Sequence, residues 1–273
     1  MTETAESPLL SRDGKPARIL VTNDDGIYAP GLAVLEMIAR SLTDDVWVVA
    51  PESEQSGASH SLSLANPIRM RELDERHFAV LGTPADCVLM AVRKVMPERP
   101  DLVLSGVNSG QNMADDVTYS GTIAAAMEGT AIGLKSFALS QAYGIHGMRG
   151  LRWDVAEAYG AKVVRRLYGL DLGPGVLLNI NFPDCKPDEV AGIEVTRQGK
   201  RDQSLLHVDE RVDTRNRAYY WLGFKREHSN PAAGTDLRAV ADRRISVTPL
   251  HMNLTQIEAL EALRSALDEA GDG

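Results

Sequence analysis

The sequence predicts an α/β protein built around a doubly wound, mostly parallel β-sheet, and two observations indicate this class. Short apolar segments recur along the first two thirds of the chain, and stretches with helical periodicity separate them. Strands that alternate with helices are typically parallel, because each helix returns the chain to the edge where the next strand begins. A length of 273 residues is sufficient for one large domain with an appendage, or for two domains.

The first elements set the pattern for this sheet. The segment 18–22 contains the apolar run Ile19-Leu20-Val21, which is typical of a buried strand. A helix is expected over 83–96, with Thr83 in the capping position and Pro84 in the first turn. The helix expected over 30–42 has one apolar face, formed by Leu32, Leu35, Ile38 and Ala39. Further strands are expected at 46–50, 101–105, 137–140 and 176–181, and further helices at 121–132 and 153–167.

After about residue 184 the pattern changes. Residues 193–198 and 217–224 are expected to form strands on either side of a polar, arginine-rich segment, which predicts a long hairpin or an extended arm. A last strand is expected at 244–249. Residues 255–258 have the spacing of a capping box, and the helix that follows has apolar side chains on one face, at Ile257, Leu260, Leu263 and Leu267.

The composition excludes several classes of protein. A net charge of −9 is the opposite of what a general nucleic-acid or anionic-membrane binder needs. The two cysteines, Cys87 and Cys185, lie far apart in sequence and form no disulfide framework or cysteine-rich metal motif. Residues 1–16 contain acidic side chains and no long apolar core, so they do not read as a secretory signal. No apolar run could span a bilayer, and we expect a soluble cytoplasmic protein with no membrane or nucleic-acid duplex partner.

Two adjacent carboxylates follow the first predicted strand, in the segment Asn23-Asp24-Asp25-Gly26. Ligands of open α/β sheets bind just beyond the carboxyl ends of the strands. Two acids placed side by side there repel each other unless a cation lies between them. The alternative interpretation is a simple turn and helix cap, since Asn, Asp and Gly are common turn residues. The Gly-x-Gly-x-x-Gly pattern of a dinucleotide site is not found in this segment.

Two further polar clusters follow predicted strands, at 51–61 and 105–112. The carboxyl ends of parallel strands lie at one edge of a sheet, so Asp24, Asp25, Ser56 and Asn108 can converge there. Carboxylate, hydroxyl and amide oxygens suit hard cations such as Mg²⁺ or Mn²⁺, whereas Zn²⁺ favours His and Cys. The sequence therefore predicts a site for a hard divalent cation.

A phosphate-binding turn is predicted at Ser120-Gly121-Thr122, immediately before the helix expected from residue 121. Free backbone N–H groups and the helix dipole make such a helix start a good anion site. The alternative is that this segment is only a helix cap, which is the more frequent role of Ser-Gly-Thr before a helix.

Several ordered motifs resemble the SurE family of survival proteins, which are metal-dependent 5′-nucleotidases. The resemblance covers most of 18–140 and resumes at Thr235-Asp236-Leu237 and at 246–250. The segment Asp242-Arg243-Arg244-Ile245 departs from the family pattern, which commonly has Gly-Tyr-Ile or similar there. The matching motifs are Asn-Asp-Asp-Gly (23–26), Val-Ala-Pro (49–51), Gln-Ser-Gly-Ala-Ser-His-Ser (55–61), Gly-Thr-Pro-Ala-Asp-Cys-Val (82–88), Ser-Gly-Val-Asn-Ser-Gly-Gln-Asn (105–112) and Tyr-Ser-Gly-Thr (119–122).

The resemblance implies a Rossmann-like catalytic domain, here residues 17–190 after a disordered leader at 1–16. Residues 191–273 would then supply a hairpin arm, a last strand and a helix that assemble subunits into a homodimer or homotetramer. The family's metal positions match Asp24, Asp25, Ser56 and Asn108, which implies one Mg²⁺ or Mn²⁺ per subunit. The implied reaction is hydrolysis of nucleoside monophosphates, 5′ and in some cases 3′, with occasional action on short polyphosphate.

Other residues have more than one interpretation. His60 either donates a proton to the leaving oxygen, or orients phosphate, or is only hydrogen-bonded within its loop. Asn23 either orients substrate or caps the turn, and Asn112 either binds phosphate or holds its loop. Asp24 and Asp25 are both candidates to accept a proton from the attacking water, and the sequence does not choose between them.

Two rival functions share the same residues. A covalent aspartyl-phosphate route generally uses Asp-x-Asp, whereas the two acids here are adjacent and their side chains diverge. A non-catalytic, metal-dependent nucleotide sensor would have the same site but would release no phosphate.

Overall fold

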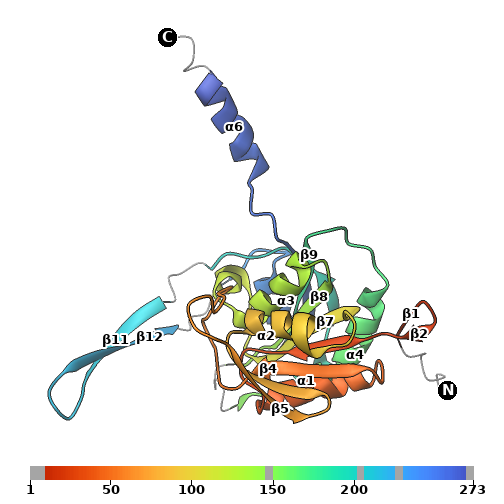
Figure 1. Cartoon of the computed structure of the whole chain (residues 1–273). Coiled ribbons are helices and arrows are strands. Elements are labelled where there is room, and N and C mark those ends of the chain that lie inside the picture. Colours follow the sequence, from red (N-terminus) through yellow and green to blue (C-terminus); the bar gives the residue numbers. More distant parts are fainter. Residues whose placement is uncertain (1–9, 145–149, 202–205, 225–229, 269–273) are drawn as a thin grey trace.

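A single mixed sheet forms the centre of the molecule (Figure 1). The computed structural model describes residues 10–144, 150–201, 206–224 and 230–268. Within these ranges nine strands form the sheet, and six of its eight strand pairs are parallel, which confirms the predicted class. In spatial order the strands are β10 (Gly192–Val195), β13 (Arg244–His251), β9 (Val176–Phe182), β8 (Lys135–Gln141), β7 (Leu102–Ser109), β3 (Ile19–Thr22), β4 (Val46–Pro51), β6 (His77–Leu81) and β5 (Arg69–Asp74).

Helices cover both faces of this sheet. On one face α1 (Pro30–Arg40) and α4 (Asp154–Tyr168) pack on a core that includes Leu35 and Phe137. On the other face α2 (Pro84–Met90) and α3 (Gly121–Ala131) pack on residues such as Leu20. The central strands β3 and β7 are therefore buried on both sides, as expected for apolar runs without alternation.

The start of α2 follows the sequence rule for a helix cap. The Thr83 hydroxyl accepts the Asp86 N–H at 3.1 Å, and the Asp86 carboxylate accepts the Thr83 N–H at 2.8 Å. The helix expected through residue 96 ends earlier in α form, because Ala91–Val95 adopts a π-helical turn. The β5–β6 hairpin was not expected from the sequence. Most of β5 is exposed and polar, so it lacks the apolar alternation that marks a half-buried strand.

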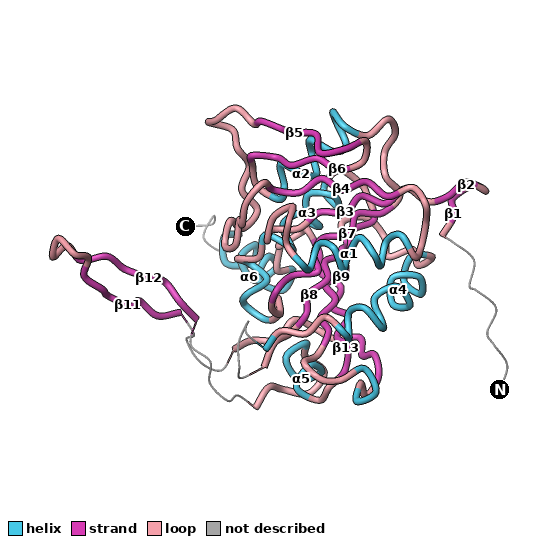
Figure 2. The backbone as a smooth tube through the Cα atoms, turned by 90° about the horizontal axis from the view of Figure 1, so that it is seen from below, coloured by secondary structure: helices cyan, strands magenta, loops and turns pink. Residues whose placement is uncertain are grey.

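The C-terminal strands pair differently from the expectation. Residues 193–198 and 217–224 do not pair with each other: β10 pairs in parallel with β13, and β12 (Ala218–Phe224) pairs with β11 (Leu206–Val212). The β11 partner was missed because charged residues interrupt its apolar ones. The expected arm nevertheless exists as the β11–β12 hairpin, which stands apart from the sheet in both views (Figure 1, Figure 2).

Helix α6 (Ile257–Asp268) also projects from the body of the molecule (Figure 1). The expected cap at Thr255 is one residue early, because the Gln256 side chain accepts the Ala259 N–H. The predicted apolar face is largely exposed, and Leu263 and Leu267 retain 61% and 71% of their accessible surface. None of the described helices is long and apolar enough to cross a bilayer.

The described chain begins with a short strand pair. Residues 1–9 lie outside the described ranges, and β1 (Ser11–Arg12) and β2 (Lys15–Pro16) form a short antiparallel pair. Leu10 is buried, and its N–H donates to the carbonyl of Leu42 at 2.7 Å. One apolar side chain and its backbone bond thus attach residue 10 to the core, and the disordered leader over 1–16 stays a prediction.

The predicted boundary at 190/191 lies within one continuous sheet, because β10 and β13 follow it in the chain and extend the sheet beyond β9. The hairpin and α6 are the parts of 191–273 that leave this sheet. The division into two domains stays a prediction.

The carboxylate of Asp45 accepts hydrogen bonds from residues at the beginnings of β3, β4 and β6. These strand ends lie at the edge of the sheet opposite the polar clusters. The donors are Arg18 Nε at 2.7 Å, Trp47 Nε1 at 3.0 Å and the Arg76 guanidinium. Burial alone would raise the pKa of Asp45, but the hydrogen bonds from Arg76, Arg18 and Trp47 outweigh it and lower the pKa below its ordinary value.

We therefore expect Asp45→Asn to lower the free energy of unfolding at pH 7 by about 1–2 kcal/mol, since bonds to a charged group are lost. Because the folded-state pKa is depressed, this stability is present above the unfolded pKa of about 3.9 and disappears as pH falls through the folded value. Urea unfolding of wild type and Asp45→Asn between pH 7 and pH 3 measures the difference in their free energies of unfolding. A difference that stays constant down to pH 3 would contradict a lowered pKa for Asp45.

Candidate metal and phosphate site

The turn after β3 is closed by Asn23, which is fully buried. Its side-chain nitrogen donates to the carbonyl of Gly26 at 2.9 Å, and its side-chain oxygen accepts the Gly26 N–H at 3.2 Å. The two bonds hold the chain in a tight turn, so Asp24 and Asp25 leave the strand in fixed directions. The turn-capping role of Asn23 is visible, and a role in orienting substrate stays a prediction.

Asp24 lies against the start of α3. It is 4% exposed, and its Oδ1 accepts the Thr122 hydroxyl at 2.6 Å. Burial raises the pKa of Asp24 to about 6, the Thr122 hydrogen bond offsets part of this effect, and the charge of Asp25 adds to it. A charged Asp24 is therefore costly in the protein alone, and a bound cation would offset that cost.

Asp25 is less buried than its neighbour and is held by the end of β7. Its Oδ2 accepts the Ser109 N–H at 3.0 Å. Burial raises the pKa of Asp25, hydrogen bonds from Ser109 act against it, and the charge of Glu54 raises it further. The carboxylates of residues 24 and 25 thus diverge toward α3 and β7, and neither has a basic partner in the hydrogen bonds of the described residues.

The two other predicted ligands lie beside this turn, Ser56 on the loop after β4 and Asn108 near the end of β7. The loop after β4 is attached to it, because the Gln55 N–H donates to the Asp24 carbonyl at 2.7 Å. Ser56 follows on this loop, exposed, with its hydroxyl donating to Glu54 at 2.9 Å. Asn108 is half-buried, and its side-chain nitrogen donates to the Gly110 carbonyl at 2.8 Å. Its amide oxygen is the atom that Asn108 can offer a cation.

The chemistry of these side chains fits a hard cation. Mg²⁺ and similar ions are usually held by one or two carboxylates, with water and phosphate oxygens completing the shell. In the described ranges no three His, Cys, Asp or Glu side chains gather in one place, so carboxylates alone would not complete the shell of a cation. Thr22 and Ser105 lie opposite each other on the neighbouring strands β3 and β7. Their buried hydroxyls have no hydrogen-bond partner among the described residues. The edge of the sheet is therefore polar beneath the carboxylates as well.

The predicted phosphate turn is already engaged within the protein. Ser120 is the N-cap of α3, and its hydroxyl accepts the Ile123 N–H at 3.1 Å. Thr122 is fully buried and donates to Asp24. These contacts establish the capping role, while phosphate binding by Ser120, Gly121 and Thr122 stays a prediction. The Thr122–Asp24 contact had no sequence signal, because 98 residues separate the two.

His60 contacts a buried acid that the sequence did not single out. Its Nε2 lies 2.9 Å from Oε2 of Glu128, which is 8% exposed on α3. The contact fixes the ring and attaches the loop after β4 to this helix. A role in proton transfer stays a prediction.

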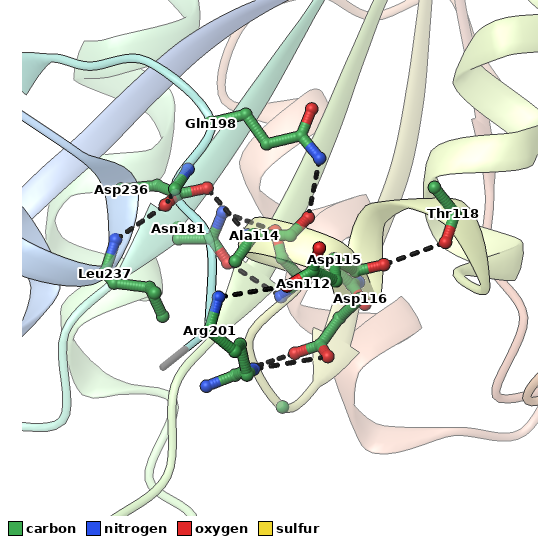
Figure 3. A network of polar contacts seen from close by, with 12 residues as sticks. Asn112, Ala114, Asp115, Asp116, Thr118, Asn181, Gln198, Arg201, Asp236 and Leu237 are labelled. Atoms are coloured by element: carbon green, nitrogen blue, oxygen red, sulfur yellow. Dashed lines mark hydrogen bonds and ion pairs between the residues drawn. The ribbon is translucent and has the colours of Figure 1, made fainter. Parts of the chain in front are cut away.

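Asn112 belongs to a buried amide network (Figure 3). Its N–H donates to Asn181 Oδ1 at 2.9 Å, and its side-chain nitrogen donates to Ser140 at 2.9 Å. Asn179 and Asn181 both donate to its carbonyl. The loop-holding interpretation is thus realised, and phosphate binding by Asn112 stays a prediction.

Known proteins are similar to this chain in sequence and in fold. A sequence model of the family described as Survival protein SurE matches residues 19–205. The 5′-nucleotidase SurE of Parvibaculum lavamentivorans is 63% identical over 254 residues, covering 93% of this chain and 92% of that protein. The 5′-nucleotidase SurE of Methylobacterium radiotolerans is 59% identical and covers 92% and 100%. The crystal structure of the SurE protein from Aquifex aeolicus superimposes with a TM-score of 0.77 at 36% identity, covering 91% of this chain and 99% of that one.

A substitution at Gly121 tests whether the position of the Asp24 carboxylate affects the binding of a divalent cation. A Cβ at Gly121 would lie 2.8 Å from Asp24 Cβ and 2.9 Å from its Oδ2, so Gly121→Ala must displace the carboxylate. Alanine favours a helix more than glycine does, so the fold should survive. We expect the Mn²⁺ dissociation constant, from calorimetric titration, to rise about tenfold, or about 1.4 kcal/mol. Gly169→Ala is the control, because its Cβ would meet nothing within 4 Å. Equal affinities in both variants would contradict a role for Asp24.

Proposed function

Because the chain belongs to the SurE family, we propose that it is a metal-dependent phosphomonoesterase that hydrolyses nucleoside 5′-monophosphates to nucleoside and phosphate. The main support is its identity of 63% and 59% to proteins named 5′-nucleotidase SurE, over more than nine tenths of each chain. On this basis the chain is an enzyme, a 5′-nucleotidase. Nucleoside 3′-monophosphates and short polyphosphate are further proposed substrates.

One divalent cation per subunit, Mg²⁺ or Mn²⁺, is proposed to bind Asp24, Asp25, Ser56 and Asn108. When bound, such a cation neutralises phosphoryl oxygens and lowers the pKa of a water molecule. The support is the arrangement of two carboxylates without a basic partner in the described hydrogen bonds, beside the Asn108 amide at the end of β7 and the Ser56 hydroxyl on the loop after β4.

The protein's own groups have separate proposed tasks. Thr122 and Ser109 hold the two carboxylates by hydrogen bonds, so neither needs to reorganise when phosphate arrives. Asp25 is the proposed acceptor of the water proton, because it is the less buried of the pair. Residues 120–122 and Asn112 are proposed to bind the remaining phosphate oxygens. Asn23 is proposed to orient the substrate from the turn that it closes.

His60 is the proposed donor to the leaving oxygen. Its support is Glu128, whose carboxylate lies 2.9 Å from Nε2 and fixes the ring orientation. The second ring nitrogen, Nδ1, is then the atom from which a proton can reach the leaving group.

Phosphate release from nucleotides tests this function. With Mg²⁺ or Mn²⁺, we expect turnover of 5′-AMP, and with a chelator we expect none. Asp25→Asn should lower kcat/KM at least about 100-fold, or about 2.7 kcal/mol, because a proposed ligand and proton acceptor is lost. Asp13→Asn is a matched control at an exposed turn. Binding of AMP without phosphate release would indicate the sensor instead. A phosphorylated Asp24 or Asp25 in a quenched reaction would indicate the covalent route.

Self-assembly into a homodimer or homotetramer is the proposed role of the arm and α6. A lone two-stranded hairpin is marginally stable in water and normally needs a surface to pack on. β12 exposes a run of large side chains, with Tyr220, Trp221 and Leu222 retaining 60%, 59% and 70% of their accessible surface. Exchange of such elements between identical subunits is a low-cost route to an oligomer. The reducing cytoplasm is the proposed compartment, because Cys87 and Cys185 are both buried and free.

Replacing 206–224 by a short Gly-Ser linker tests the arm. We expect the variant to shift toward monomer in light scattering, while its Mn²⁺ affinity stays within about threefold of wild type. Replacement of the β1–β2 turn, residues 12–15, by a linker of the same length serves as the control. A variant that remains oligomeric but loses Mn²⁺ would place the arm in the active site instead.

A further inference from the structure

A buried carboxylate from the C-terminal region, Asp236, holds the loop that follows β7 (Figure 3). Asp236 is fully buried in the first turn of α5 (Asp236–Ala241). Its Oδ2 accepts the N–H of Ala114 at 2.9 Å, and its Oδ1 accepts the N–H groups of Gly199 at 2.9 Å and Leu237 at 2.7 Å. These three donors compensate a charge that is shielded from water.

Both backbone polar groups of Ala114 are hydrogen-bonded to side chains from the C-terminal region. Besides the N–H bond to Asp236, its carbonyl accepts the Gln198 side chain at 2.8 Å. Ala114 has a φ of +53°, a left-handed conformation that is uncommon for a residue with a Cβ. Such a conformation persists only where the surroundings impose it. The bonds from Asp236 and Gln198 are the contacts that impose it here.

The held loop connects the parts of the candidate site. It begins after Ser109, the last residue of β7, includes the buried Asn112, and continues as a short helical turn over Ala114–Thr118. The Thr118 carbonyl accepts the Ser59 hydroxyl at 2.8 Å, which joins the Ser56 loop to this turn. The chain then enters α3, where Thr122 holds Asp24. A shift at Ala114 would therefore be transmitted toward several of the proposed ligands.

We propose that Asp236 is a positioning residue of the active site. By fixing the backbone of Ala114, it sets the loop between β7 and α3, and with it the Ser56 loop attached at Thr118 and the Thr122–Asp24 pair. The proposal rests on the proposed function, since it assigns Asp236 a role in that same metal and phosphate site.

Asp236→Asn tests this role, because the amide keeps an oxygen for Gly199 and Leu237 but turns a donor toward the Ala114 N–H. We expect the Mn²⁺ dissociation constant of the metal-free protein to rise about tenfold, as for residues that orient ligands. Hydrogen exchange at the Ala114 amide should accelerate. Asp45→Asn is the control: it loses a carboxylate clamp at the opposite edge and should lower Tm without changing the Mn²⁺ dissociation constant.

A second substitution tests the route through Ala114. Glycine adopts a positive φ without strain, so Ala114→Gly in the Asp236→Asn background should return Mn²⁺ affinity toward wild type. Failure of this rescue would overturn the route, and a wild-type dissociation constant in Asp236→Asn alone would overturn the proposal. Wild-type protein that binds Mn²⁺ but releases no phosphate from AMP would overturn the proposed function alone, so the two failures are distinguishable.

Discussion

The contact between Asp24 and the start of α3 is the constraint on which the candidate site depends. It places a nearly fully buried carboxylate at the N-terminus of α3, where the helix has free backbone N–H groups. It also joins the end of the central strand β3 to a helix that covers one face of the sheet. Gly121 must lack a side chain for the carboxylate to fit. The adjacent Asp25 is directed instead toward β7, where its carboxylate accepts the Ser109 N–H.

Two buried aspartates show how the surroundings decide what a carboxylate does. Asp236 accepts three backbone N–H groups, so its charge is compensated within the protein and it fastens loops. Asp24 accepts the Thr122 hydroxyl and lies next to a second acid, and burial raises its pKa to about 6. The first arrangement compensates the charge within the protein. In the second the charged form remains costly, which is the electrostatic property expected of a carboxylate that is to bind a cation.

Local signals made much of this fold predictable. The unbroken apolar strands, the Thr83 cap of α2 and the Asn23 turn all depend on residues within a few positions of each other. The contacts that complete the site have no such signal: 68 residues separate His60 from Glu128, and 122 separate Ala114 from Asp236. Strand pairing at the sheet's end was mistaken for the same reason, since β10 joins β13 and not the next strand in the chain. Sequence spacing identifies which side chains are chemically suitable, whereas tertiary contacts decide what holds them.

The position of β13 also bears on how the protein is made. β9 pairs with β13, which begins at Arg244, so this side of β9 receives its partner strand only after residues 244–251 have been synthesised. Asp236, whose carboxylate accepts the Ala114 N–H, precedes that strand by only a few residues. The loop after β7 is therefore synthesised long before the side chain that holds it. Its attachment and the pairing of β9 with β13 both wait for the same late segment of the chain.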